Sequence, residues 1–204
     1  MTRIIPPLTL LLLAGCATST DEHGGIYVGN PSMVALRVAD PAPAATVDSG
    51  ELALDSVTID HCDSESEIAV ADVHDLLGEV RYALEVGDLC GITVHVAGPL
   101  TLSGTHNNGE DWSVTLELED VEVKIRGNVE RIEGDLVFEL GRPGWLQSEI
   151  ARANGPIEVG SPASEAHKEV ASRLWDEAYL FVDNDKDGWL SAEERRAEAI
   201  GAVE

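Results

Sequence analysis

Residues 26–142 alternate between apolar and polar side chains with a period of two. This pattern constrains the fold strongly, because successive side chains of a β-strand point to opposite faces while a helix repeats every 3.6 residues. The clearest alternating runs are 33–38, 80–86, 92–96, 112–118, 121–125 and 136–140. Polar or glycine-rich breaks separate them at 87–88, 98–99, 104–109 and 127–128. Short strands at this spacing predict an antiparallel β-sandwich-like domain, or a barrel, over 26–142.

Residues 183–194 carry carboxylates at alternating positions, followed by a glycine and a closing glutamate. Hard cations such as Ca²⁺ take six to eight oxygen ligands, which a single loop can supply in this order. The predicted ligands are the side chains of Asp183, Asp185, Asp187, Ser191 and Glu194 and the backbone carbonyl of Trp189. Gly188 allows the sharp turn between them, because a residue without Cβ reaches positive φ at low cost.

This stretch resembles the loop of an EF-hand, with every ligand position filled and the aliphatic Leu190 at position eight. The resemblance implies one bound Ca²⁺, with Glu194 giving two oxygens and Ser191 acting directly or through water. EF-hand loops normally pair, and this sequence contains one such loop. Leu190 must therefore pack on the rest of the chain or meet another molecule. The alternatives are a solvated acidic turn and a dockerin-type half-motif.

The flanks of the loop predict a helix on each side. Ser161-Pro162 is typical of a helix start, and a helical stripe follows, formed by Val170, Leu174, Ala178 and Phe181. Residues 192–200 predict a short exit helix. We therefore expect an EF-hand helix-loop-helix over 162–204, joined to the β domain by a connector, 143–161, that contains a short helix. The predicted fold class is mainly β with a C-terminal α unit.

The N-terminus predicts export. Arg3 precedes an apolar run at 8–13, which is the layout of a secretory signal peptide and is too short to span a bilayer permanently. Residues 13–16, Leu-Ala-Gly-Cys, resemble a bacterial lipobox. The resemblance implies removal of residues 1–15 and attachment of diacylglycerol and a further acyl chain such as palmitate to Cys16. Residues 16–25 would then be a tether to the membrane, and Ala17 favours sorting to the outer membrane. An ordinary signal peptide is the alternative.

Two cysteines, Cys62 and Cys90, remain for the exported protein. In an oxidising envelope they most simply form one disulfide. A zinc site built from both cysteines with His61 and His95 is the alternative. The alternation of residues 90–96 argues against it, since it points His95 away from the face that carries Cys90.

The net charge and the absence of common catalytic motifs exclude several classes of function. A formal charge of −25 repels nucleic acid and anionic lipid headgroups, so no nucleic-acid partner is expected. The chain contains no serine-hydrolase elbow, phosphate-binding loop or zinc-protease motif, and His106 in its glycine-rich segment fits a solvated histidine better than a general base. We predict a lipid-anchored protein of the bacterial envelope that binds Ca²⁺ through the loop 183–194 and is not an enzyme. Its role would be structural, as Ca²⁺-stabilised architecture, or binding, as Ca²⁺-dependent contact with an envelope protein partner. The alternatives are an envelope enzyme with catalytic residues scattered over loops, and an interaction module whose Ca²⁺ is purely stabilising.

Overall fold

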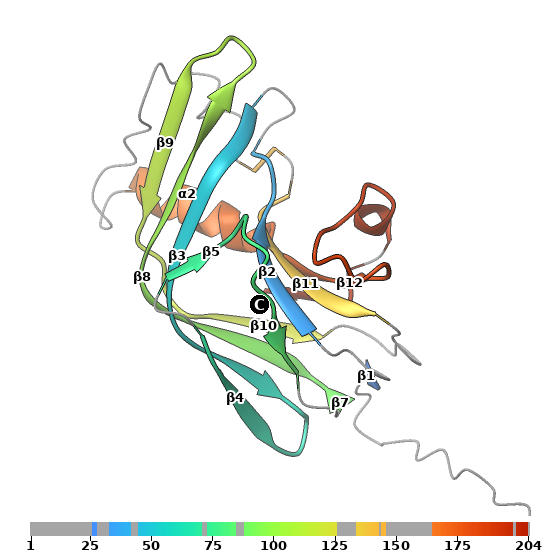
Figure 1. Ribbon diagram of the computed structural model, residues 1–204. Coiled ribbons are helices and arrows are strands. Elements are labelled where there is room, and N and C mark those ends of the chain that lie inside the picture. The colour runs from blue at the N-terminus through green and yellow to red at the C-terminus, as the bar shows by residue number, and fades with distance from the viewer. Residues whose placement is uncertain are drawn as a thin grey trace, which may run out of the picture.

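One curved sheet of eleven strands dominates the part of the chain that the structure describes (Figure 1). The computed structural model describes residues 26–27, 33–41, 45–70, 73–84, 88–125, 134–142, 144–145, 165–197 and 199–203. The predicted signal peptide, Cys16, the tether and most of the connector lie outside these residues. Within the described ranges, no helix has the length and apolar character needed to cross a bilayer.

The strands of the sheet are β2 (Met33–Val38), β3 (Ala45–Asp60), β4 (Glu65–Ala69), β5 (Val73–Asp75), β6 (Tyr82–Ala83), β8 (Gly91–His106), β9 (Asp111–Leu116), β10 (Val121–Ile125), β11 (Asp135–Leu140), β12 (Tyr179–Asp183) and β13 (Gly201–Val203). Their order is β4-β3-β8-β10-β13-β12-β11-β2-β6, with β5 paired to β3 and β9 to β8. A separate antiparallel pair joins β1 (Ile26–Tyr27) to β7 (Asp88–Leu89).

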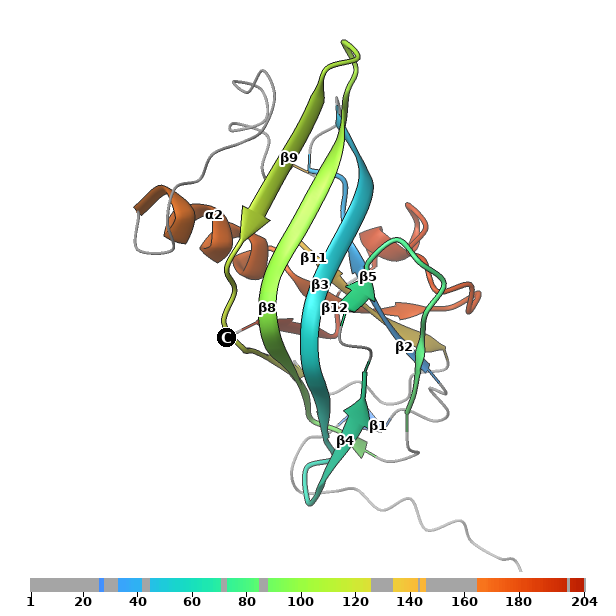
Figure 2. The same ribbon diagram turned by 60° about the vertical axis from the view of Figure 1, so that its left-hand side comes forward.

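The mainly β fold predicted from the alternation is confirmed, but the described strands form no sandwich of two packed sheets. The strands form one continuous sheet that curls into a near-barrel, as the two views in Figures 1 and 2 show. Every pairing in this sheet is antiparallel except β11 with β2, which is parallel. A parallel pair needs a long crossover between its strands, and about a hundred residues separate β2 from β11 here.

The long strands β3 and β8 carry the curvature. They pair over their whole length, and Figure 2 shows them side by side with β9. The register shifts at three places, between Val47 and Ser49 and on both sides of Leu54. Such bulges bend a strand, which lets two long strands follow a closed surface. The predicted break at 98–99 is wrong, since β8 continues through it next to one of these bulges, where a proline is tolerated.

The C-terminal part of the chain completes the same sheet. Strands β12 and β13 lie between β11 and β10, so the last described residues join the two halves of the sheet. The preceding helix, α2 (Glu165–Asp176), runs behind the sheet (Figure 2) and buries Val170 and Leu174 in its core.

The predicted disulfide between Cys62 and Cys90 is confirmed, with a Cα–Cα distance of 5.2 Å. It joins the end of β3 to the start of β8, beside the backbone hydrogen bond from the Cys90 amide to the Asp60 carbonyl. A cross-link closing a loop of this length stabilises a fold by roughly 3–4 kcal/mol in the chain-entropy description. The zinc alternative fails, because neither disulfide-bonded sulfur is available as a thiolate ligand.

A neutral histidine lies inside the core. His74, 1% exposed, donates from Nε2 to the Leu36 carbonyl (3.1 Å), and its Nδ1 lies 2.7 Å from the Tyr82 hydroxyl. Burial lowers the pKa of His74, and the nearby Arg37 lowers it further. The folded protein therefore resists protonation of this ring.

Acid should weaken the fold through His74. A histidine side chain in the unfolded protein has a pKa of about 6.5. Below that pH the unfolded state binds a proton at His74, whereas the native state does not until the pH reaches its lowered pKa. The free energy of unfolding should then fall by up to about 1.4 kcal/mol per pH unit between pH 6.5 and the lowered native pKa. The measurement is urea unfolding of wild type and His74→Gln from pH 7.5 to 5. The difference between the two should grow in the variant's favour as the pH falls. Parallel stability curves would contradict the assignment.

Candidate metal centre

Strand β12 leads directly into the acidic loop and positions its first carboxylate. Asp183 is the last residue of β12, and its side chain is fully buried. Its Oδ1 accepts a hydrogen bond from the Lys186 amide and its Oδ2 accepts one from the Gly188 amide, both at 2.7 Å. Gly188 has a φ of +86°, the turn conformation that the sequence predicted for it. One carboxylate therefore shapes the tip of the loop.

Glu194 closes the loop from its far end. Its Oε1 accepts from the Asn184 amide (2.7 Å) and its Oε2 from the Ser191 amide (2.8 Å). In return, the Ser191 hydroxyl accepts a hydrogen bond from the Glu194 amide at 3.2 Å. These bonds bring the predicted position-twelve ligand back to the start of the loop.

The three aspartates converge. Asp183, Asp185 and Asp187 each offer a carboxylate oxygen, and these oxygens lie within 4.8 Å of one another. Beside them a hollow of about 550 Å³ is lined by Asn184, Asp185, Ser191, Glu193, Glu194 and Ala197. Of the predicted ligand side chains, the structure thus clusters three and places two others around the adjoining hollow. The Trp189 amide donates to Asp187 Oδ1 (2.8 Å), and the residue as a whole is 36% exposed.

The electrostatics of the two buried carboxyls differ. Burial raises the pKa of Asp183, and the hydrogen bonds from Gly188 and Lys186 oppose that rise only in part. Burial also acts on Glu194, but hydrogen bonds from Ser191 and Asn184 outweigh it and leave its pKa below the usual value. Asp183 is thus the carboxylate whose charge is hardest to keep without a nearby cation.

The elements that flank the loop differ from the prediction. No helix-loop-helix is formed by the described residues 165–197. The helix α2 ends at Asp176, and Tyr179–Asp183 form β12, because this aromatic and β-branched run pairs with β11 along its full length. The exit is a single 3₁₀ turn, η1 (Glu194–Arg196), since the Ile200 amide must reach the Leu180 carbonyl to start β13. The start of the predicted helix at Ser161-Pro162 lies outside the described residues.

Leu190 packs on the chain's own sheet. It is 6% exposed and clusters with Ala35, Val137 and Phe181, which come from β2, β11 and β12. In Figure 1 the loop, in red, stands beside these strands. The outer face of the sheet therefore covers the position-eight side chain that the sequence left without a partner.

Two arginines that sequence reasoning did not single out hold the loop from the sheet side. Arg37, 2% exposed, donates from Nε to the Gly188 carbonyl (2.9 Å) and from Nη1 to the Leu36 carbonyl (2.9 Å), and stacks 4.6 Å from the Trp189 ring centroid. Arg81 donates from Nη1 to the Lys186 carbonyl at 2.7 Å. The sequence contained one signal for Arg37, since it is a charged residue within the mostly apolar run 33–38.

A third arginine fastens the exit turn. Arg195 binds the buried Glu139 of β11 through Nε and Nη2, a two-pronged contact. Hydrogen bonds to Glu139 raise the pKa of Arg195. Bidentate pairs of this kind fix orientation as well as adding energy, so η1 is held to the sheet by side chains rather than by helix length.

A hydrogen-bonded chain of a different chemistry lies on β3 and β8. His95 Nε2 is 3.2 Å from the Thr58 hydroxyl, and His95 Nδ1 is 3.0 Å from Asp120 Oδ2. The Val96 amide holds the other Asp120 oxygen at 2.8 Å. Hydroxyl, imidazole and carboxylate in this order match the roles in nucleophilic catalysis, although the side chains of His95 and Asp120 are 34% and 56% exposed.

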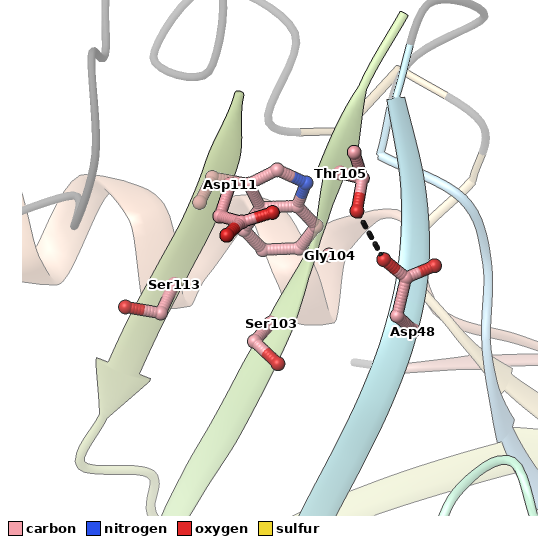
Figure 3. A pocket seen from close by; sticks show the side chains of 7 residues that line it. Asp48, Ser103, Gly104, Thr105, Asp111 and Ser113 are labelled. Atoms are coloured by element: carbon pink, nitrogen blue, oxygen red, sulfur yellow. Dashed lines mark hydrogen bonds between the residues drawn. The ribbon is translucent and has the colours of Figure 1, made fainter. Parts of the chain in front are cut away.

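A second hollow, of about 380 Å³, lies where β3, β8 and β9 run together (Figure 3). Its lining residues are Asp48, Ser103, Gly104, Thr105, Asp111, Trp112 and Ser113. The Thr105 hydroxyl donates to Asp48 across the strands (Figure 3), and this bond is the main cause that lowers the pKa of Asp48. The hydroxyls of Thr46 and Thr105 both donate to this carboxylate, so its hydrogen-bonding capacity is already engaged within the sheet.

Comparison with known proteins returns nothing similar: no family model, curated protein or solved structure matches the chain.

Truncating the loop's apolar anchor should destabilise the protein. Leu190→Ala removes a buried side chain from the cluster with Ala35, Val137 and Phe181, and such changes cost about 2–5 kcal/mol. The control is Val80→Ala, since Val80 is 46% exposed and its loss should change stability by less than about 0.5 kcal/mol. Denaturant unfolding of the three proteins is the measurement. Equal costs for both variants would mean that Leu190 does not anchor the loop.

Proposed function

We propose that this protein binds one Ca²⁺ in the loop 183–194. The supporting observation is the convergence of oxygens from Asp183, Asp185 and Asp187 within 4.8 Å of one another. Three carboxylates this close repel one another unless a cation sits between them. An all-oxygen set that includes the predicted carboxylates, a hydroxyl and a carbonyl suits a hard cation, whereas zinc prefers nitrogen and sulfur.

Ca²⁺ fits this loop better than Mg²⁺. Ca²⁺ accepts six to eight ligands in flexible geometry, while Mg²⁺ demands a near-ideal octahedron and keeps several waters. The predicted set, with a bidentate Glu194, is rich in ligands and irregular. In the ion-bound state, the oxygens of Glu194 would contact the metal while also accepting hydrogen bonds from the amides of Asn184 and Ser191.

The proposed setting is the bacterial cell envelope. The lipobox-like Leu13-Ala14-Gly15-Cys16 supports a lipid anchor on Cys16, and the Cys62–Cys90 disulfide suits an oxidising compartment. Several acyl chains tether a protein firmly, since each buried methylene contributes about 0.8 kcal/mol. The proposed role is structural or binding. Bound Ca²⁺ would stabilise the face of the molecule formed by the loop, and that face would contact an envelope protein partner.

The enzyme alternative draws on the Thr58–His95–Asp120 chain. It ranks second, because nucleophilic catalysis also needs donors for the developing oxyanion and a site that excludes water, whereas this chain lies on an exposed sheet face.

Calcium titration tests the proposal. Isothermal titration calorimetry of wild type should give one Ca²⁺ per chain, with a dissociation constant on the order of 10⁻⁴–10⁻³ M, as in extracellular modules. Glu194→Gln removes a predicted bidentate ligand and should weaken binding more than about tenfold, and Asp183→Ala should abolish it at millimolar Ca²⁺.

The matched control is Glu67→Gln, which removes the same charge from an exposed residue of β4, at the edge of the sheet. Its affinity should stay within about twofold of wild type, since only a screened surface charge is lost. Equal Ca²⁺ uptake by all four proteins would reveal diffuse attraction to a surface of charge −25, and the loop site would have to be abandoned.

The anchor is tested separately. Cys16→Ser should remove the acyl chains, so the protein produced in a bacterial host should move from the membrane to the soluble fraction. The double variant Cys62→Ser/Cys90→Ser also loses cysteines but should still partition with membranes. Recovery of wild type as a soluble protein without acyl chains on Cys16, by mass spectrometry, would refute the anchor.

A further inference from the structure

Two arginines, Arg37 and Arg81, donate hydrogen bonds to backbone carbonyls of the loop 183–194 from the side of the sheet. We propose that Arg37 and Arg81 position the loop 183–194 for Ca²⁺ and take the place of a paired loop, so that one chain binds the ion as a monomer. This inference rests on the proposed function. It concerns how the site is held rather than which residues ligate.

Arg37 fixes the peptide that precedes the predicted carbonyl ligand. The peptide between Gly188 and Trp189 is held on both sides: its carbonyl accepts from Arg37 Nε (2.9 Å) and its amide donates to Asp187 Oδ1 (2.8 Å). The Trp189 ring also stacks on the same guanidinium. The peptide that leads into Trp189 is therefore fixed before any ion arrives, directly next to the carbonyl that would ligate from position seven.

Arg81 fixes the strained residue of the loop. Lys186 has a φ of +61°, a left-handed conformation that costs energy for a residue with a Cβ. Its amide donates to Asp183 (2.7 Å) and its carbonyl accepts from Arg81 Nη1 (2.7 Å). Arg81 itself is tied to the buried Asp135 of β11. Lys186 is thus held by two hydrogen bonds, one to the predicted ligand Asp183 and one from Arg81 on the side of the sheet.

Charge and position predict opposite effects for these arginines. A cation beside the carboxylates repels Ca²⁺, so if only charge mattered, removing an arginine would strengthen binding. If the arginine holds the loop in shape, the loop backbone of the variant must become ordered when Ca²⁺ binds. The free energy of that ordering weakens binding, so the affinity falls. The sign of the change therefore separates a positioning residue from a nearby charge.

Arg81 is the residue to test, because its side chain is 32% exposed and its replacement should leave the core intact, whereas Arg37 is buried. Arg81→Gln should bind Ca²⁺ on the order of tenfold more weakly, the value of one hydrogen bond to a charged donor. Arg81→Lys keeps a donor and should recover most of the loss. Arg196→Gln is the matched control: Arg196 is exposed, two residues from Glu194, and none of the described residues receives a hydrogen bond from its side chain.

Calorimetric titration with Ca²⁺ alone gives the affinities, circular dichroism checks that each variant is folded, and sedimentation velocity with and without Ca²⁺ gives the mass. Wild type should remain a monomer with bound Ca²⁺, and Arg196→Gln should bind as wild type does or slightly more tightly. Arg81→Gln binding as well as or better than wild type would overturn the inference, as would a dimer that forms on Ca²⁺ binding. If wild type takes up no Ca²⁺, the proposed function is overturned instead. The two failures are distinguishable, because the inference about the arginines is judged only from variants compared with a wild type that binds Ca²⁺.

Discussion

The pairing of β12 with β11 on one side and β13 on the other is the contact on which the rest of the structure depends. It brings residues near 180 and 201 into a sheet begun at residue 33, so the curled sheet is complete only when the C-terminal segment is in place. Asp183 is the last residue of this central strand. Because Asp183 still pairs with Asp135 of β11, the acidic loop starts from a residue that the sheet holds in place.

The same pairing determines how the loop is supported. An isolated acidic loop would depend on an ion to hold its carboxylates together, whereas here the sheet supplies an apolar socket for Leu190 and hydrogen-bond donors from Arg37 and Arg81. The buried guanidinium of Arg37 is stabilised by the carbonyls of Leu36 and Gly188, by the Trp189 ring and by the nearby carboxylates of Asp75, Asp183 and Asp187. Arg37 and Arg81 thus have two opposite effects on cation binding: their hydrogen bonds hold the loop in shape, and their positive charge repels the ion. The balance of the two effects would set the affinity of the loop for a cation.

The strands could be predicted where the alternation is unbroken, and not where bulges interrupt it. The runs at 33–38, 121–125 and 136–140 correspond to β2, β10 and β11. Strand β3 went unrecognised, because its register shifts around Leu54 move the apolar residues from one phase to the other. Residues 178–182 fit a helical stripe as well as a strand, and only pairing with β11 selects the strand. Short apolar runs are ambiguous in this way, since periodicity needs length to discriminate.

The sequence by itself determined the acidic loop, its turn at Gly188, the disulfide partners and the β character of the chain, because each depends on residue type and local spacing. Only the tertiary structure decided that the strands form one curled sheet, that a strand rather than a helix enters the loop, and that Leu190, Arg37 and Arg81 meet there. The two arginine contacts join residues 151 and 105 positions apart. No local pattern records which distant strands become neighbours, since that outcome depends on how the whole sheet buries its apolar face.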